Sequence, residues 1–313
     1  MTPLPDSAFV HAFGAYLPDQ VVDNQQLASK LERTPEWIEQ ASGIRERRRA
    51  APEETAAGMA VKAAQDCLCR AGKQSSSLGM LMVSSGSAAQ GFPGPAAEVA
   101  AKLGLEGTPA LDIPIASAGT LFGLVLAANC AAQFGDVLVI GSEKMSAVVD
   151  QSPLDPNTAI LFGDGAGAAL VSSQSGTWRV GSSALHSDGQ FREDLKMNAQ
   201  GLTMNGLSVI MQASRKLPAV IQEVLAAEGL TVADIGMFLV HQANQNLLTR
   251  VGKALSADAN RIFSNISRYG NTSSASVLIA ASEYVNSGDA KGPLVLAAFG
   301  AGFHWGAMVL HQA

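Results

Sequence analysis

The chain repeats one order of secondary structure elements in two separate regions. In the first region we expect a strand at 110–116, a turn of small residues at 117–119, a helix, and two further strands at 137–141 and 166–172. In the second, the turn and the two later strands are expected at 269–273, 294–299 and 305–310. Turn and next strand lie about 20 residues apart in both, the length of one crossover helix. The repeat predicts two similar α/β halves, residues 1–172 and 173–313, packed into one body.

The composition agrees with a buried sheet. Hydrophobic residues make up 47% of the 313 residues and charged residues only 15%, so most elements must be covered on more than one side. The formal net charge is −6, which gives no electrostatic reason to expect nucleic acid or an anionic membrane as a partner.

One uncharged segment, residues 113–135, raises the question of a membrane span. Pro114, Ser117, Asn129 and Gln133 interrupt it, so a strand followed by a buried core helix is the favoured interpretation. The first 18 residues have no basic start followed by an apolar stretch, which argues against a signal peptide. The three cysteines form neither a metal-ligand pattern nor an even disulfide set, and we expect a reduced, cytoplasmic protein.

Ser117 is the first candidate for chemistry. It stands where a buried strand gives way to a helix, and the N–H groups at a helix start favour negative charge on a nucleophile. The alternative is a serine that caps the helix, and Ser117 taken alone favours it. No G-x-S-x-G motif surrounds Ser117, so the α/β-hydrolase route to a nucleophilic serine has no support.

His241 and Asn271 are the other candidates. His241 follows the apolar run 237–240, and the carboxyl end of a buried strand is where open α/β folds build active sites. Asn271 sits in a Gly-Asn pair, which is also a common turn. An asparagine amide and a neutral histidine aimed at one oxygen would stabilise an enolate, the species that forms when a malonyl thioester loses carbon dioxide.

Two glycine clusters need a different interpretation from nucleotide binding. Residues 163–167 run into a strand instead of opening a helix, which is the opposite of the dinucleotide fingerprint. Residues 300–302 follow a buried strand, where a backbone N–H is either an oxyanion donor or part of a tight turn.

Six motifs together resemble the β-ketoacyl-acyl-carrier-protein synthase III family of the thiolase fold. They are GIRERR at 43–48, GDGAGAA at 163–169, HSDG at 186–189, HQAN at 241–244, YGNTS at 269–273 and FGAGF at 299–303. The resemblance spans nearly the whole chain. It implies a thiolase-like α/β fold with duplicated αβαβα five-layer architecture, a homodimer and an acyltransferase of fatty acid or polyketide biosynthesis.

The resemblance also implies roles for particular residues. Ser117 takes the position of the family's nucleophilic cysteine, His241 and Asn271 match the decarboxylating pair, and the backbone N–H groups of Ser117 and Ala301 match the oxyanion donors. Further matches are implied at the substrate-binding positions Trp37, Phe92, Asn205 and Gly206, and at Arg250 and Lys253, which either dock an acyl carrier protein or are solvated charges. Trp37 would stack on the adenine of coenzyme A, and Phe92 would reach into the acyl pocket of the dimer partner. No cofactor or metal is expected beyond the acyl thioester, carried by coenzyme A or by a carrier protein's phosphopantetheine.

Several positions depart from the family pattern. A hydroxyl cannot be ionised in advance as a thiol can, so Ser117 needs a base as it attacks. The usual basic positions of the donor site hold Ala41, Pro156, Met211 and Asn246. The first hypothesis is a starter-type ketoacyl synthase that uses serine, similar to starter-unit synthases and acyltransferases of polyketide pathways. The alternatives are an acyltransferase that passes the acyl group to an alcohol, amine or thiol, a catalytically silent partner, and an engineered Cys-to-Ser form.

Overall fold

The computed structural model describes residues 8–88, 92–151, 154–198 and 201–313. Its described strands build a nine-stranded sheet in the order β11-β12-β13-β8-β1-β7-β6-β4-β5. In that order the strands are β11 (Met237–Val240), β12 (Leu294–Gly300), β13 (His304–Gln312), β8 (Trp178–Ser187), β1 (Phe9–Tyr16), β7 (Gly165–Ser172), β6 (Asp136–Glu143), β4 (Leu78–Ser84) and β5 (Ala110–Ile113). The mixed α/β prediction is confirmed.

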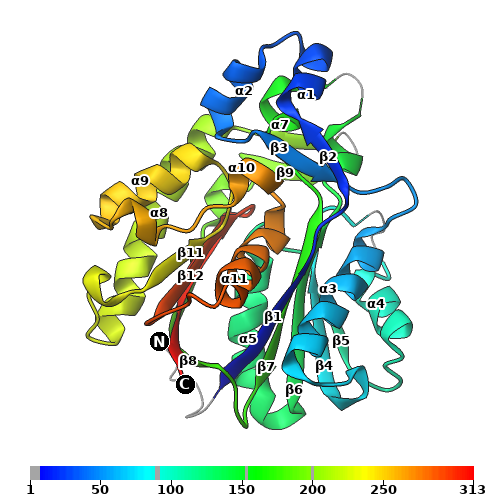
Figure 1. Ribbon diagram of the computed structural model, residues 1–313, viewed down its shortest axis with the longest axis vertical. Helices are drawn as coiled ribbons and strands as arrows, with labels where there is room; N and C mark the ends of the chain where they lie inside the picture. Colours follow the sequence, from blue (N-terminus) through cyan, green and yellow to red (C-terminus); the bar gives the residue numbers. More distant parts are fainter. Residues whose placement is uncertain (1–7, 89–91, 152–153, 199–200) are drawn as a thin grey trace.

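The sheet has two parts that meet at a narrow junction. Strands β1 and β8 pair only through Phe9 with Arg179 and Val10 with Trp178. Helices α5 (Gly119–Phe134) and α11 (Ser276–Asn286) lie between the two parts and contact strands of both (Figure 1). Because both helices are covered on two sides, α5 contains no charged residue and half of its residues are buried.

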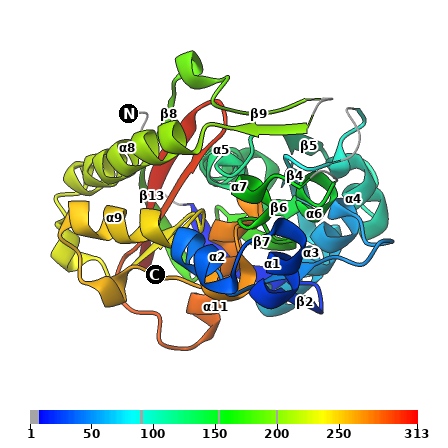
Figure 2. The same cartoon turned by 90° about the horizontal axis from the view of Figure 1, so that it is seen from above.

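Two outer layers complete the body. Helices α3 (Ala56–Ala71) and α4 (Pro95–Leu103) cover the part of the sheet formed by β1, β7, β6, β4 and β5. Helices α8 (Gly206–Ala227) and α9 (Gln245–Leu255) lie beyond the part formed by β8, β13, β12 and β11. Seen from above, α8 and α9 lie on one side of α5, and α3 and α4 on the other (Figure 2). The order helix, strand, helix, strand, helix is the five-layer arrangement that the resemblance implied. The boundary at residue 172 stays a prediction.

Smaller elements surround one end of these layers. They are β2 (Gln20–Asp23), α1 (Asn24–Leu31), α2 (Pro35–Ser42), β3 (Glu46–Arg49), α6 (Ser146–Val149), α7 (Pro156–Ala159), the hairpin β9 (Leu195–Asn198) and β10 (Gly201–Met204), and α10 (Ile266–Tyr269). Single 3-10 turns lie at 75–77, 189–191, 232–234, 259–261 and 273–275, and those at 75–77 and 232–234 precede β4 and β11. Helix α2 begins as its sequence indicates, with Thr34 accepting a hydrogen bond from Trp37 N and Pro35 at the first position.

The element predictions hold except near the turns. Strand β5 ends at Ile113 and not at residue 116, because Pro114 has no N–H to continue the ladder. Helix α11 starts at Ser276, after a 3-10 turn, and not directly after residue 273. The uncharged segment forms the core helix α5, and no helix among the described residues is long and apolar enough to cross a membrane.

Candidate active site

Ser117 lies in the turn between β5 and α5, and its backbone is left-handed. Its φ of 65° is uncommon for a residue that has a side chain. The cap residue of α5 is Ala118, where no side chain accepts a hydrogen bond. The helix-cap interpretation of Ser117 is therefore wrong, since a capping residue has an extended backbone and accepts from the first turn. A strained residue that lines a cavity is a candidate functional residue.

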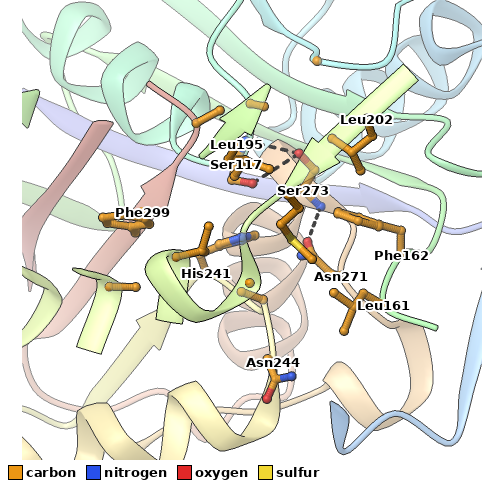
Figure 3. A pocket seen from close by; sticks show the side chains of 18 of the residues that line it. Ser117, Leu161, Phe162, Leu195, Leu202, His241, Asn244, Asn271, Ser273 and Phe299 are labelled. Atoms are coloured by element: carbon orange, nitrogen blue, oxygen red, sulfur yellow. Dashed lines mark hydrogen bonds between the residues drawn. The ribbon is translucent and has the colours of Figure 1, made fainter. Parts of the chain in front are cut away.

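A second strained serine holds this turn from the other half of the chain. Ser273 has a φ of 47°, and its Oγ accepts a hydrogen bond of 3.1 Å from Ser117 N. The two Oγ atoms are 3.4 Å apart, as the dashed lines in Figure 3 show. The backbone N–H that the resemblance assigns to the oxyanion site is thus engaged by Ser273 in this structure.

His241 follows β11 and is buried, with 3% of its surface exposed. Burial lowers the pKa of its imidazole to about 4, so the ring is neutral at neutral pH. Ser276 Oγ lies 2.5 Å from His241 Nδ1 and accepts a hydrogen bond of 3.2 Å from Gln242 N. Ser276 can therefore donate its hydrogen to Nδ1, which places the ring hydrogen on Nε2, the other nitrogen.

Asn271 is fixed on three sides. Its N–H donates to Leu161 O at 2.8 Å, and its carbonyl accepts from Gly163 N at 3.0 Å. Its Oδ1 accepts from Ser273 N at 2.8 Å. Because an N–H can only donate, this contact identifies the oxygen of the side-chain amide and leaves the Nδ2 hydrogens for a ligand.

Glycines let the loops of the two halves approach. A Cβ on Gly300 would lie 2.0 Å from Ala116 O, and one on Gly163 would lie 2.1 Å from Tyr269 O. Neither contact is possible with a side chain, so these glycines bring the turn at Ala301 beside Ser117 and the GDGAGAA segment beside the Asn271 loop. That segment leads into β7, as predicted, and opens no helix.

The three candidates share one cavity of about 130 Å³. Figure 3 shows Ser117, His241, Asn271 and Ser273 around it, and apart from Lys196 and Asn244 the remaining side chains that line it are apolar. The apolar lining comprises Met145, Leu161, Phe162, Leu195, Met197, Leu202, Met204, Val209, Ile210, Ala213, Leu247 and Phe299. Few polar groups in a largely apolar pocket are typical of an enzyme site, and the low dielectric strengthens their interactions.

Some of the other predicted site residues line the cavity and the rest lie outside it. Ala301 and Gly206 line the cavity. Asn205 does not; its Oδ1 caps α8 by accepting from Ser208 N at 3.2 Å. Trp37 on α2 is partly exposed with the Arg33 guanidinium over its ring, and Arg250 and Lys253 are exposed on α9. Phe92 is 93% exposed.

Sequence reasoning missed the roles of three residues: Ser273, which lines the cavity, and Ser276 and Glu143, which lie behind it. Glu143 is fully buried at the end of β6 and accepts from Gly86 N, Ser87 N and the hydroxyl of Ser274. It joins the two halves directly behind Ser273. An acid at the end of the apolar run 137–141 was a usable signal, because acids are rarely buried without a purpose. Ser273 and Ser276 gave no comparable signal in the sequence.

The described residues contain no group of side chains that could hold a metal ion. The polar groups that line the cavity suit hydrogen bonding to a carbonyl or hydroxyl. A hydroxyl, a neutral imidazole and an amide NH₂ are the elements of nucleophilic and general base catalysis.

Comparison with known proteins gives consistent matches. Residues 111–189 match the family profile 3-oxoacyl-[acyl-carrier-protein] synthase III, and residues 225–312 match its C-terminal profile. A beta-ketoacyl-[acyl-carrier-protein] synthase III of Pectobacterium atrosepticum is 39% identical over 313 residues, covering 95% of this chain and 97% of that protein. The protein of the same name from Salmonella paratyphi A is 37% identical over 310 residues, with the same coverage.

Solved structures of similar proteins have the same fold as this chain. The 3-oxoacyl-[acyl-carrier-protein] synthase III of Aquifex aeolicus superposes with a TM-score of 0.93 and 32% identity, covering 97% of this chain and 100% of that one. The priming β-ketosynthase of the R1128 polyketide biosynthetic pathway superposes with a TM-score of 0.90 and 30% identity, covering 100% and 98%.

Proposed function

The chain belongs to the 3-oxoacyl-[acyl-carrier-protein] synthase III family of acyl-transferring condensing enzymes, and from this premise we propose that it is a starter-type ketoacyl synthase with Ser117 as its acyl acceptor. Its reaction joins an acyl group to a malonyl carrier with loss of carbon dioxide. The observation that carries the proposal is the convergence of Ser117, His241 and Asn271 on one apolar cavity.

In the first half-reaction, Ser117 Oγ attacks the carbonyl carbon of an acyl thioester. A C–O bond forms, the C–S bond breaks, and the proton of Ser117 passes through His241 to the departing thiol. Burial supports the role of base, since it keeps the imidazole of His241 neutral at neutral pH. This role uses an unprotonated Nε2, so the ring hydrogen lies on Nδ1 during this step.

In the second half-reaction, the malonyl thioester loses carbon dioxide and an enolate forms. Asn271 Nδ2 and His241 Nε2–H then donate hydrogen bonds to the enolate oxygen. The contact of Asn271 Oδ1 with Ser273 N supports this, because it leaves both Nδ2 hydrogens available. The carbanion attacks the acyl-serine ester, a C–C bond forms, and Ser117 regains a proton. Ser276 suits both steps, since its hydroxyl can donate to Nδ1 or accept from it.

A second candidate function is transfer of the acyl group to an alcohol, amine or thiol. One observation favours it. Asn246 is a neutral residue at a position of the donor site that is usually basic, and its Nδ2 donates to Gln40 O and Ala41 O, so it serves the contact between helices α9 and α2. A catalytically silent partner and an engineered Cys-to-Ser form are the remaining alternatives to an active natural enzyme.

The partners of this function are an acyl carrier protein, an acyl thioester and a second copy of the chain. Phe92 is 93% exposed and Leu111 on the edge strand β5 is 43% exposed, which supports a homodimer in which Phe92 enters the neighbour's acyl pocket. Arg250 and Lys253 are exposed on α9 and suit an acidic carrier. Trp37 suits an adenine ring. No cofactor is proposed, and a cytoplasmic location stays a prediction.

Mass spectrometry with a panel of acyl thioesters tests the proposal. We expect acyl mass on the peptide that contains Ser117, no adduct in Ser117→Ala, and release of carbon dioxide with a ketoacyl product after a malonyl carrier is added. Absence of an adduct with every donor would refute both enzymatic readings. An adduct that moves only to a non-malonyl acceptor would favour the second function.

A further inference from the structure

The hydroxyl of Ser273 lies against the reacting oxygen of the site. We propose that Ser273 is a catalytic residue whose O–H donates a hydrogen bond to Ser117 Oγ and so assists both the attack and the departure of that oxygen. The inference rests on the proposed function of Ser117 as the acyl acceptor. Nothing in the resemblance or in the proposed half-reactions gives Ser273 this role.

The geometry of the two serines carries the inference. Ser273 Oγ lies 3.4 Å from Ser117 Oγ and accepts from Ser117 N at 3.1 Å. Both residues are buried, 3% and 8% exposed, and both line the cavity. Both residues also have a positive φ, 47° for Ser273 and 65° for Ser117, so the fold keeps two residues in an unfavourable backbone conformation at the place where their hydroxyls are in contact. In resting enzymes such a contact is often long and shortens when substrate binds.

Counting hydrogens gives the direction of the bond. Each serine hydroxyl has one hydrogen, and Ser273 Oγ already accepts one from Ser117 N. Among the described residues, the other contact of the Ser273 hydroxyl is Ser117 Oγ. If Ser117 donated instead, the hydrogen of Ser273 would be buried without a partner there, which is costly. With Ser273 donating, the hydrogen of Ser117 is free to pass to His241.

The chemistry of a serine nucleophile explains why such a donor matters. In acylation, negative charge develops on Ser117 Oγ as its proton leaves for His241 and the C–O bond forms. In condensation, the C–C bond forms and the C–O bond breaks, so the same oxygen leaves with negative charge and takes a proton from solvent by way of His241. An alkoxide is far more basic than a thiolate, so a hydrogen bond to it stabilises the transition state more. Ser273 donates this bond in both steps and keeps its own proton.

The surroundings of Ser273 keep its hydroxyl in place. Its N–H donates to Asn271 Oδ1 at 2.8 Å. The next residue, Ser274, is held by the carboxylate of Glu143, and a Cβ on Gly141 would lie 2.5 Å from Ser274 O. A group fixed before the reaction begins stabilises charge without a cost of reorientation.

A double-mutant cycle between positions 117 and 273 tests the inference. Single-turnover acylation is measured by quenching and intact mass, with one acyl-coenzyme A donor, in the wild type, Ser273→Ala, Ser117→Cys and the double variant. We expect Ser273→Ala to slow acylation about 10- to 100-fold when residue 117 is serine. In the Ser117→Cys background the same change should cost less than about threefold, because a thiol ionises without that help.

Two further variants separate chemistry from folding. Ser273→Gly also removes the hydroxyl but relieves the positive φ, so it should slow acylation as Ser273→Ala does, in a protein at least as well folded. Ser282→Ala removes a buried hydroxyl of α11 that lies outside the cavity and should leave the rate unchanged. Circular dichroism checks that each variant is folded.

The outcomes distinguish the inference from the function on which it rests. An equal loss in the serine and cysteine backgrounds would mean that Ser273 only shapes the site, and would overturn the inference. Faster acylation in Ser273→Ala would overturn it as well, because the hydroxyl would then merely block Ser117 N. If the wild type forms no adduct on Ser117 with any donor, the proposed function fails, and the inference fails with it.

Discussion

The neutral state of His241 makes the stability of the protein depend on pH. Burial lowers the pKa of His241 from the ordinary 6.5 to about 4. Between these two values the unfolded chain binds a proton at this residue and the folded chain does not. Stability is therefore lost as pH falls through 6.5 and levels off below about 4. Since one pH unit corresponds to 1.36 kcal/mol, the loss due to this residue is about 3 kcal/mol.

The perturbation that isolates this loss is His241→Gln, which keeps a polar side chain but does not titrate. Urea unfolding of the two proteins is compared in steps from pH 7.5 to pH 4. Other histidines, such as His186 beside Glu223 and His311 beside Glu228, are present in both proteins, so their contributions cancel in the comparison. We expect the free energy of unfolding of the wild type to fall by about 3 kcal/mol more than that of the variant.

The same reasoning applies to activity. The rate of acylation in the wild type should show no decrease near pH 6.5 and should decline only as pH approaches 4, where His241 becomes protonated. Unfolding curves that fall in parallel for wild type and variant would refute the argument, and so would an acid limb of activity centred on pH 6.5.

Three other changes test separate parts of the site. Ser276→Ala removes the hydroxyl that orients the ring of His241, and because one hydrogen bond is worth about 1 kcal/mol, product formation should fall about five- to tenfold while the protein stays folded by circular dichroism. Gly300→Ala places a Cβ 2.0 Å from Ala116 O, so thermal unfolding should show a loss of at least about 2 kcal/mol together with loss of acylation. Arg250→Glu should raise KM for a carrier-bound thioester several-fold and leave KM for the coenzyme A thioester unchanged; equal effects on both would argue against carrier docking on α9.

Much of the fold was predictable because its signals are local. The apolar run 237–240 forms β11 with the expected bounds, and the uncharged segment that begins near residue 113 forms the core helix α5. Prediction failed where a single residue outweighs the pattern. Pro114 ends β5 three residues early, although the sequence remains small and apolar up to Ala116.

The candidate site was predictable only in part. His241 could be found because it ends a buried strand, and Asn271 because it stands in a recognisable motif. Ser117 alone indicated a helix cap, and only its left-handed backbone, with Ala118 as the cap of α5, excludes that interpretation. The resemblance to a family directed attention to Ser117, whereas local propensity directed it away.

The sequence by itself determined the layers and the strand that presents His241, and it placed Ser117 at the start of a buried helix. The tertiary structure decided which groups surround Ser117. Ser273 is 156 residues from Ser117, and Ser276 is 35 residues from His241. Hydrophobic periodicity reports which face of an element is buried, but it carries no information about which hydroxyl meets which atom across the core. Those contacts depend on the packing of the two halves through glycines, and they appear only when the chain is folded.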